Sequence, residues 1–327
     1  MSESIIKIND LAVQYNTDNG VVYAVNGVSL EVEKGKTLGL VGETGAGKTT
    51  IARSILRILP VPPAEVKSGS IEFEGRELTA LSEKEMEKVR GDQISMIFQD
   101  PMSALNPAFT VGDQIKECIE LHQDVSKSEA TERGMKMLEM VGIPRERFFE
   151  YPHQFSGGMK QRVVIAMALA CNPSLLLADE PTTALDVTIQ AQVLELISKL
   201  QKELDTAMIL ITHDLGVVAK CCDDVAIIYA GRIMEYGTKE QVYLQTAHPY
   251  TRGLFNSLPD VNSTAKRLKP IPGLMPDPSN LPEGCPFAPR CEYATEECRA
   301  GRIEETVMED GHRVRCLHPI GKEESHE

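Results

Sequence analysis

The sequence predicts an α/β protein with a mainly parallel β-sheet at its core, an antiparallel β subdomain, a helical subdomain and a small proline-rich C-terminal extension. Continuous apolar runs of five or so residues recur along the chain, as is typical of strands buried on both faces. Polar residues directly follow several of these runs. A glycine-rich loop also joins the first run, residues 37–41, to a helical pattern that starts at residue 50. We therefore expect a functional site at the strand ends.

Composition narrows the possible functions. The chain has 327 residues, 42% of them hydrophobic, and a formal net charge of −14. This acidity argues against non-specific binding to nucleic acid or to an anionic membrane surface. No apolar run is long enough to span a bilayer and no signal segment opens the chain, so we expect a cytosolic protein. Its eight cysteines are then expected to be reduced.

Residues 42–49 fit the phosphate-binding pattern G-x-x-x-x-G-K-[ST] at every fixed position. Glycines let the backbone wrap closely around a polyphosphate with its N–H groups pointing inward. Lys48 would reach the β and γ phosphates, and the Thr49 hydroxyl would bind Mg²⁺. The predicted nucleotide-binding residues here are Gly42, Glu43, Thr44, Gly45, Ala46, Gly47, Lys48, Thr49 and Thr50.

Residues 5–32 alternate between apolar and polar and contain turn chemistry at residues 17–20, which predicts antiparallel strands. Tyr15 and Tyr23 lie in this segment. Each could stack on an adenine ring or pack in a small core. The residues alone leave both interpretations open.

Other polar groups follow the later strand runs. Gln99 comes after the run at residues 94–98 and could aim an amide at the site or be an ordinary strand-end residue. Asp179 and Glu180 end the run that starts at residue 175; Asp179 is placed to hold Mg²⁺ and Glu180 to polarise a water. His213 ends the run at residues 207–212, and we interpret it as catalytic.

Between these strands, residues 111–151 carry a helical pattern without a strand signal, which predicts a helical insertion. Ser156, Gly157 and Gly158 follow, at the start of another apolar helical run. Such a motif offers a hydroxyl and N–H groups to an anion, although it could also be a plain N-cap.

With these motifs in this order, residues from about 5 to 245 resemble the nucleotide-binding domain of an ABC transporter. The resemblance implies a RecA-like P-loop NTPase core with a helical subdomain at about residues 100–165. Ser-Gly-Gly is the discriminating signature. This copy has Phe155 and Met159 in place of the commoner leucine and glutamine, and Met159 is usual in the peptide-importer branch.

The resemblance also implies roles. Two such domains would close on ATP, each nucleotide lying between the phosphate loop of one and the signature motif of the other. Gln99 would contact metal and attacking water, Glu180 would act as general base and His213 would contact the γ-phosphate. Thr49, Gln99 and Asp179 would hold Mg²⁺. Tyr15 would stack on adenine, and Asp186 would lie in the loop that crosses the dimer interface.

Residues 246–327 form the predicted extension, where four cysteines follow the spacing C-x5-C-x6-C-x17-C. They are Cys285, Cys291, Cys298 and Cys316. This spacing matches no common zinc module or ferredoxin, so Zn²⁺, an iron–sulfur cluster and unligated thiols all remain open. His312 and His318 are possible substitute ligands. The segment has too little apolar pattern for a core of its own, so something else must hold it.

The extension resembles that of oligopeptide and dipeptide importer ATPases, through His-Pro-Tyr at residues 248–250, Ile-Pro-Gly at 271–273 and the stretch at 281–291. In that family the four cysteines can bind a 4Fe–4S cluster, and Zn²⁺ is the alternative. The implied role is structural, with electron transfer as the other interpretation.

The main functional prediction is an ATP-hydrolysing subunit that powers import of di- and oligopeptides from the cytoplasmic face of the membrane. The resemblance implies a second ATPase subunit, identical or not, two permease subunits and, indirectly, an extracellular or periplasmic peptide-binding protein. One alternative is a soluble ABC-type ATPase of DNA repair or chromosome maintenance. Another is an iron–sulfur protein that uses ATP to gate electron transfer.

Overall fold

The computed structural model describes residues 3–183, 186–257 and 270–320, and the chain divides into two compact units. Unit 1 consists of the N-terminal segment up to Ile6, Glu31–Thr37 and Glu72–Ile211. Unit 2 consists of Lys7–Leu30, Leu38–Ile71 and the segment from Thr212 onward. Each unit is therefore assembled from segments that are distant in the sequence.

Unit 1 contains three parallel strands whose residues are all buried. They are β6 (Ile94–Ile97), β7 (Leu175–Asp179) and β8 (Ala207–Thr212), paired in the order β6, β7, β8. Burial on both faces explains their continuous apolar runs, and all three were predicted from the sequence. Because the strands are parallel, their carboxyl ends lie at the same edge.

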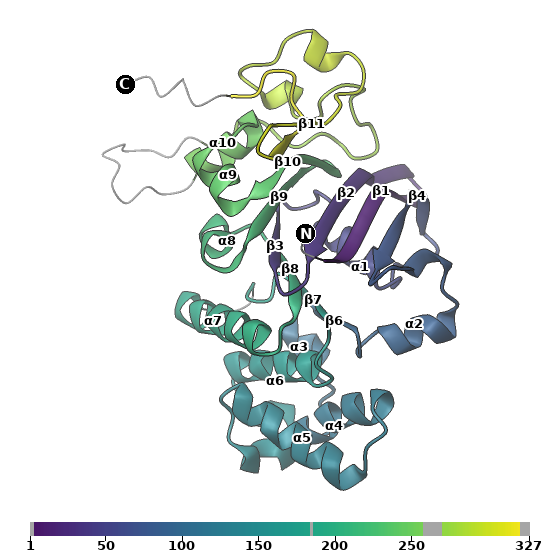
Figure 1. Ribbon diagram of the computed structural model, residues 1–327, viewed down its shortest axis with the longest axis vertical. Coiled ribbons are helices and arrows are strands. Elements are labelled where there is room, and N and C mark those ends of the chain that lie inside the picture. The colour runs from purple at the N-terminus through teal and green to yellow at the C-terminus, as the bar shows by residue number, and fades with distance from the viewer. Residues whose placement is uncertain (1–2, 184–185, 258–269, 321–327) are drawn as a thin grey trace. The chain divides into compact units, whose positions relative to one another are not determined.

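The predicted helical insertion is present in unit 1 (Figure 1). Thr110 caps one of its helices, α4, through a hydrogen bond that its Oγ1 accepts from the Asp113 N–H at 3.1 Å. Phe148 packs between α4 and α5 so closely that a Cβ at Gly112 would lie 2.1 Å from its ring. The helices of the insertion are α3 (Pro101–Ala104), α4 (Val111–His122), α5 (Lys127–Met140) and α6 (Gly157–Leu169), with 3-10 turns at Arg145–Phe149 and Pro152–Gln154.

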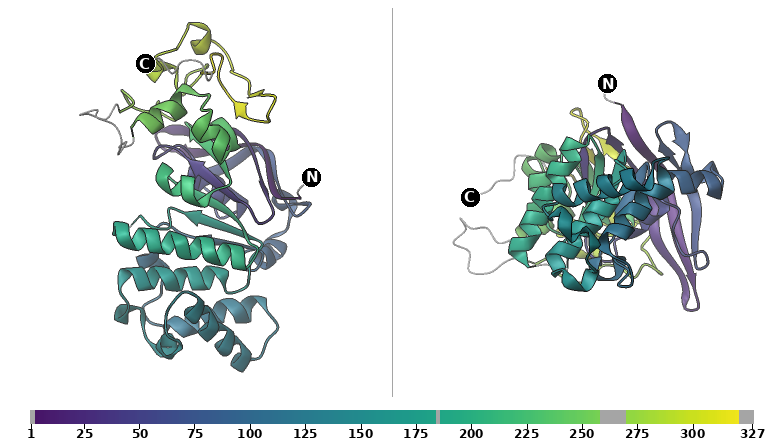
Figure 2. Two further views of the ribbon diagram at one scale, coloured as in Figure 1. Left: turned by 60° about the vertical axis from the view of Figure 1, so that its left-hand side comes forward. Right: turned by 90° about the horizontal axis from the view of Figure 1, so that it is seen from below.

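Two further helices lie in unit 1. α7 (Val187–Glu203) packs beside α6, as Figure 2 shows. α2 (Glu83–Val89) is capped by Ser82, which forms a capping box with Glu85. A 3-10 turn at Leu78–Ala80 precedes α2.

In unit 2, long strands form the predicted β subdomain (Figure 1). β2 (Gly20–Glu33), β1 (Ser4–Thr17) and β4 (Ala64–Phe73) pair in that order. The last residues of β4, which belong to unit 1, pair antiparallel with β5 (Arg76–Glu77) of the same unit. The Thr17 hydroxyl donates to the Gly20 carbonyl at 2.8 Å and closes the predicted turn.

The second sheet of unit 2 combines core and extension. β3 (Thr37–Val41) runs parallel to β9 (Asp224–Tyr229), which pairs antiparallel with β10 (Arg232–Thr238). The extension adds β12 (Arg313–Val314) to β10 and β11 (Thr306–Val307) to β12. The extension is thus held by the sheet. The helices of unit 2 are α1 (Lys48–Ile55), α8 (Leu215–Cys221), α9 (Lys239–Leu244) and α10 (Pro249–Asn256), with 3-10 turns at Ala288–Arg290 and Glu297–Arg299.

Candidate nucleotide and thiol sites

The predicted phosphate loop joins β3 to α1 in unit 2. A Cβ at Gly42 would lie 2.2 Å from the Ile228 carbonyl oxygen, and one at Gly47 would lie 2.3 Å from the Ala24 carbonyl oxygen. Gly47 also has a φ of +102°, which favours glycine. These two glycines are therefore required by the close approach of neighbouring backbone.

Lys48 begins α1 and is 6% exposed. Its Nζ donates hydrogen bonds to the carbonyl oxygens of Gly42, at 2.7 Å, and Glu43, at 3.0 Å. The cation consequently lies inside the loop that a polyphosphate would fill. The role of Lys48 toward the phosphates stays a prediction from the motif.

Of the two candidate tyrosines, Tyr15 is near the phosphate loop. Its hydroxyl lies 3.3 Å from Thr50 Oγ1 in the first turn of α1. Tyr23 is 43% exposed, and its N–H donates to the Pro278 carbonyl of the extension at 2.9 Å. Packing of Tyr23 in a small core is therefore wrong, and the adenine role of Tyr15 stays a prediction.

The predicted catalytic carboxylates lie in unit 1. Asp179 is the last residue of β7 and is 3% exposed. Glu180 follows with a φ of +45°, a backbone conformation that costs a non-glycine residue about 1–3 kcal/mol. The Gln99 Nε2 donates to Glu180 Oε2 at 2.9 Å, and the Thr183 hydroxyl donates to the same oxygen at 2.8 Å. Sequence reasoning missed Thr183.

The signature motif opens onto a hollow of about 790 Å³ in unit 1, lined also by Asp186 and Ile189. Ser156 caps α6, and its Oγ accepts the Met159 N–H at 3.4 Å. Within the described part of the chain, a Cβ at Gly157 would meet nothing within 4 Å. Packing within this chain therefore does not require a glycine at this position.

A buried glutamine connects the signature helix to the carboxylate loop. Gln161 lies on α6 with no exposed surface, and its Nε2 donates to the Pro181 carbonyl at 2.6 Å. Because Pro181 directly follows Glu180, the signature helix and the predicted general base share one hydrogen-bonded framework. No sequence pattern had indicated this residue.

His213 follows β8 at the start of unit 2 and is exposed. The next residue, Asp214, caps α8 by accepting the N–H groups of Gly216 and Val217 at 2.8 and 3.2 Å. Lys48 and His213 thus belong to unit 2, whereas Gln99 and Glu180 belong to unit 1.

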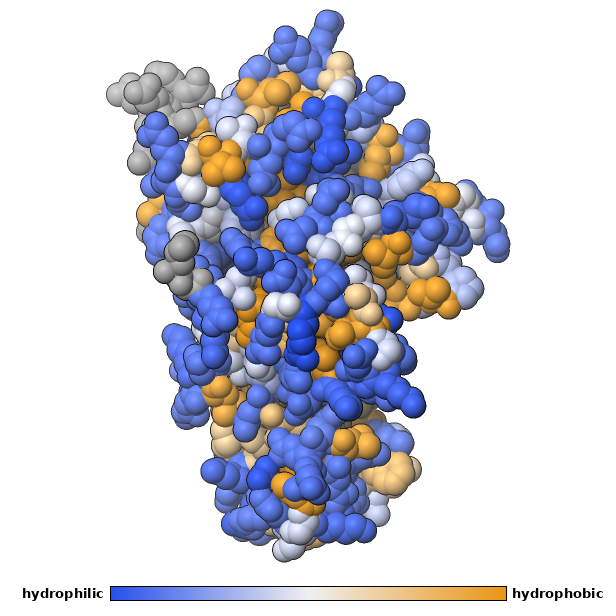
Figure 3. Space-filling model, turned by 45° about the vertical axis from the view of Figure 1, so that its right-hand side comes forward, coloured by the Kyte–Doolittle hydropathy of each residue, from blue (hydrophilic) through white to orange (hydrophobic). Residues whose placement is uncertain are grey.

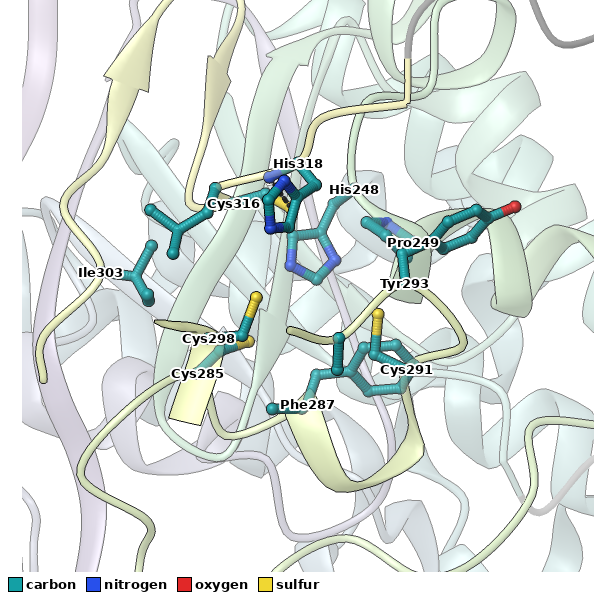
Figure 4. Close-up of a pocket in the computed structure, with 13 residues that line it drawn as sticks. His248, Pro249, Cys285, Phe287, Cys291, Tyr293, Cys298, Ile303, Cys316 and His318 are labelled. Carbon is teal, nitrogen blue, oxygen red and sulfur yellow. Dashed lines mark hydrogen bonds between the residues drawn. The ribbon is translucent and has the colours of Figure 1, made fainter. Parts of the chain in front are cut away.

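The four cysteines of the extension line one small cavity of about 20 Å³ (Figure 4). Burial raises the pKa of the Cys285 and Cys291 thiols, and it raises that of Cys316 to about 11. Among the described residues, no group of three or more His, Cys, Asp or Glu side chains is arranged to hold a metal ion. The structure therefore gathers the thiols without showing a formed metal centre.

His248 lines the same cavity with its ring among the cysteines (Figure 4). It is 1% exposed, and its Nδ1 accepts the Tyr250 N–H at 2.9 Å. Nε2 is buried, and no group among the described residues forms a hydrogen bond of normal geometry with it. Burial lowers the pKa of His248 to about 4, although the nearby Glu235 carboxylate opposes this shift.

Glu235 anchors the extension to the sheet. This carboxylate has no exposed surface and accepts the N–H groups of Ala247 at 2.7 Å and His248 at 2.9 Å. His312 Nε2, from the turn before β12, lies 2.9 Å from its Oε1. The two histidines considered as substitute ligands therefore lie in different places. His312 contacts Glu235, whereas His318 lines the thiol cavity.

A phosphate loop, strand-end carboxylates and a Ser-Gly-Gly signature define an ABC-type ATPase, and comparison with known proteins agrees. Residues 25–183 match the family "ABC transporter", and residues 234–298 match "Oligopeptide/dipeptide transporter, C-terminal region". The chain is similar to a dimeric, post-hydrolysis structure of the ATP-binding cassette MJ0796 bound to ADP and Pi. The TM-score is 0.64 and the identity 26%, over 72% of this chain and 98% of that one.

Similar proteins with known names indicate the branch of the ABC transporter family to which the chain belongs. The dipeptide transport ATP-binding protein DppD of Bacillus subtilis is 50% identical over 96% of this chain and 94% of its own length. The oligopeptide transport ATP-binding protein OppD of the same organism is 53% identical over 96% of this chain and 89% of its own length. The chain belongs to this family of peptide ABC transporter ATP-binding proteins. No helix of the described residues is long and apolar enough to cross a membrane.

Proposed function

We propose that this chain hydrolyses ATP to drive import of di- or oligopeptides. The observation that carries the proposal is the open signature motif. Gly157 faces space that no atom of the described residues fills, as expected if nucleotide held by a second ATPase subunit approaches it. The family matches support the same function and give no support to the alternative in DNA repair or chromosome maintenance.

In this function the residues of each unit have defined tasks. Lys48 and the loop amides hold the phosphates, while Glu180, oriented by Gln99 and Thr183, accepts a proton from the attacking water. Thr49, Gln99 and Asp179 are the proposed Mg²⁺ ligands, and the bound ion neutralises charge on the phosphates. His213 contacts the γ-phosphate, Asp186 lies at the subunit interface, and Tyr15 stacks on adenine.

Transport requires partners, and we propose a second ATPase subunit and two permease subunits at the cytoplasmic face of the membrane. A peptide-binding protein would act on the other side. The helical insertion would contact the permeases, because it carries exposed hydrophobic residues, which Figure 3 shows at the bottom of the view. Phe109, Leu121 and Phe149 of the insertion are 55%, 72% and 65% exposed.

Glu180→Gln in the assembled transporter tests this function. The variant is expected to bind ATP like the wild type, while ATP hydrolysis and peptide uptake into vesicles both fall by about 100-fold or more. Glu195→Gln, which removes an exposed carboxylate on α7, is the matched control. Wild-type hydrolysis by Glu180→Gln would assign the general base elsewhere. Hydrolysis without peptide uptake by the wild type would refute the transport function.

For the cysteines we propose a bound metal group, 4Fe–4S or alternatively Zn²⁺, with a structural role. The four thiols supply the right donor type, and the buried His248 N–H adds a hydrogen-bond donor. Among the described residues, these thiols are not arranged as the ligands of one metal ion. The cavity that they line, of about 20 Å³, has room for little more than one water. A cluster would therefore need this loop to expand more than a single ion would. No step of hydrolysis passes through the group.

Metal analysis and absorbance of anaerobically purified protein test the proposal. Iron with a thiolate-to-iron charge-transfer band supports the cluster, and stoichiometric zinc without iron supports the alternative. Protein that contains neither metal would refute both.

A further inference from the structure

The extension reaches the phosphate loop through Arg290, which lies between Cys285 and Cys291. The Arg290 side chain is 7% exposed. Its Nη1 lies 2.9 and 3.1 Å from the two carboxylate oxygens of Glu43, the second residue of the phosphate loop. The same nitrogen donates to the Tyr229 hydroxyl at 3.1 Å, and Nε donates to the Pro272 carbonyl at 2.9 Å. Several contacts therefore fix the guanidinium.

Further contacts join the extension to the same loop. The Tyr250 hydroxyl accepts the Glu43 backbone N–H at 3.2 Å. The methyl of Met275 would be 3.3 Å from a Cβ at Gly45. The Tyr250 ring packs against those of Tyr229 and Phe287, with centroids 4.6 and 5.2 Å apart. The extension therefore contacts both the side chain and the main chain of the loop.

Glu43 places a carboxylate in a loop built to bind an anion. Its side chain is 31% exposed, so water screens its charge only in part. Unneutralised, the carboxylate would repel incoming phosphates and reduce the benefit of the loop N–H groups and Lys48. Arg290 is the cation that the structure pairs with it, and the paired arginine offsets this repulsion.

We propose that Arg290 is a positioning residue of the nucleotide site: it neutralises Glu43 and, together with Tyr250, holds the phosphate loop in shape. This inference rests on the proposed ATPase function and makes the extension a part of that site. The thiol-bearing segment then contributes to nucleotide affinity through Arg290, whatever group its cysteines bind.

A double-mutant cycle between Arg290 and Glu43 tests the proposal on the full chain, with binding of a fluorescent ATP analogue as the readout. Arg290→Ala is expected to weaken binding about five- to tenfold, since water partly screens the carboxylate of this ion pair and keeps the coupling modest. Glu43→Gln removes the carboxylate that repels the phosphates and should bind the analogue more tightly than the wild type. The combined variant should recover most of the affinity lost in Arg290→Ala, because no unpaired carboxylate remains. Arg290→Lys should retain part of the affinity that is lost in Arg290→Ala.

The salt dependence of ATP-analogue binding distinguishes an electrostatic role of Arg290 from a role in packing. The defect of Arg290→Ala should shrink as salt rises from 0.05 to about 0.5 M, because the Debye length falls below about 5 Å. A purely structural role would leave the defect unchanged by salt. Arg302→Ala, which removes an arginine of the extension that is exposed and pairs with Glu304, is the control and should bind like the wild type.

Two results would overturn the inference. One is unchanged affinity in Arg290→Ala, and the other is a double variant as weak as Arg290→Ala alone. Failure of the proposed function itself would look different, because the wild-type chain would then not bind the ATP analogue at all.

Discussion

Gln99 donates a hydrogen bond from Nε2 to Glu180 Oε2 across 2.9 Å, although 81 residues separate them in the chain. Gln99 lies just beyond β6 and Glu180 just beyond the neighbouring parallel strand β7. The Thr183 hydroxyl donates a second hydrogen bond to the same oxygen, Oε2, of the Glu180 carboxylate. This arrangement orients the proposed general base before any water is bound.

Replacing the amide by a second carboxylate should change the pH dependence of hydrolysis. In Gln99→Glu a like charge would lie beside Glu180 and raise its pKa, so the acid limb of the kcat profile should move to higher pH. Hydrolysis at neutral pH should fall by about tenfold or more, since Gln99 is also a proposed Mg²⁺ ligand. Gln99→Ala should lower the rate without moving the acid limb. Equal profiles for both variants would contradict the electrostatic explanation.

The glycines of the two nucleotide motifs should behave differently. Gly42→Ala would bring its Cβ to within 2.2 Å of the Ile228 carbonyl oxygen, so the phosphate loop must shift. We expect nucleotide binding to fall by about 100-fold and stability by about 1–3 kcal/mol. Isothermal calorimetry and urea unfolding measure the two effects.

In Gly157→Ala the added methyl meets no atom of the residues that the structure describes, so the stability should stay within about 0.5 kcal/mol of the wild type. Hydrolysis by the assembled transporter should nevertheless fall, because the added methyl would face the nucleotide of the second subunit. Loss of stability in the isolated chain, or full activity in the transporter, would show that this glycine does not face a partner's nucleotide.

His248 should make the protein sensitive to acid. Burial lowers its pKa to about 4, from an ordinary value near 6.5, so below pH 6.5 the unfolded chain takes up a proton that the folded chain does not. Stability should therefore decline as the pH falls from 6.5 to 4, by up to about 3 kcal/mol. His248→Gln should flatten this decline in urea unfolding, whereas the exposed His153→Gln should not. A decline of the same size in His248→Gln would assign the effect to other groups.

Glu235 should be essential for attachment of the extension. Glu235→Ala removes the acceptor of two buried N–H groups and the partner of His312, which should cost about 3–5 kcal/mol. Limited proteolysis should then cut the extension faster, and the melting temperature should fall. Glu240→Ala, which removes an exposed carboxylate on α9, should change neither measurement.

The sequence predicted those features of the fold and the site that depend on a local pattern of residues. Continuous apolar runs predicted β6, β7 and β8, and the rule that parallel strands end at one edge predicted that Gln99 and Glu180 belong to one site. The phosphate loop was predicted because its glycines, Lys48 and Thr49 are contiguous. Their roles in ATP chemistry and the domain boundary near residue 245 stay predictions.

What the sequence did not reveal depends on contacts between distant residues. Arg290 and Glu43 are 247 positions apart, and neither belongs to a pattern that points to the other. Glu235 lies in an apolar strand, where nothing local indicates that N–H groups from residues 247 and 248 will surround it. Strands β11 and β12 have only two residues each, too few for a periodicity to be recognised.

The pairing of β12 with β10 also bears on solubility. A strand edge without a neighbour presents a row of backbone N–H and C=O groups that can recruit another chain. Here Glu235 and Tyr236 of β10 already face β12, and the Arg315 N–H donates to the Met234 carbonyl at 2.8 Å. Removing the extension would uncover this edge and make the rest of the chain prone to self-association.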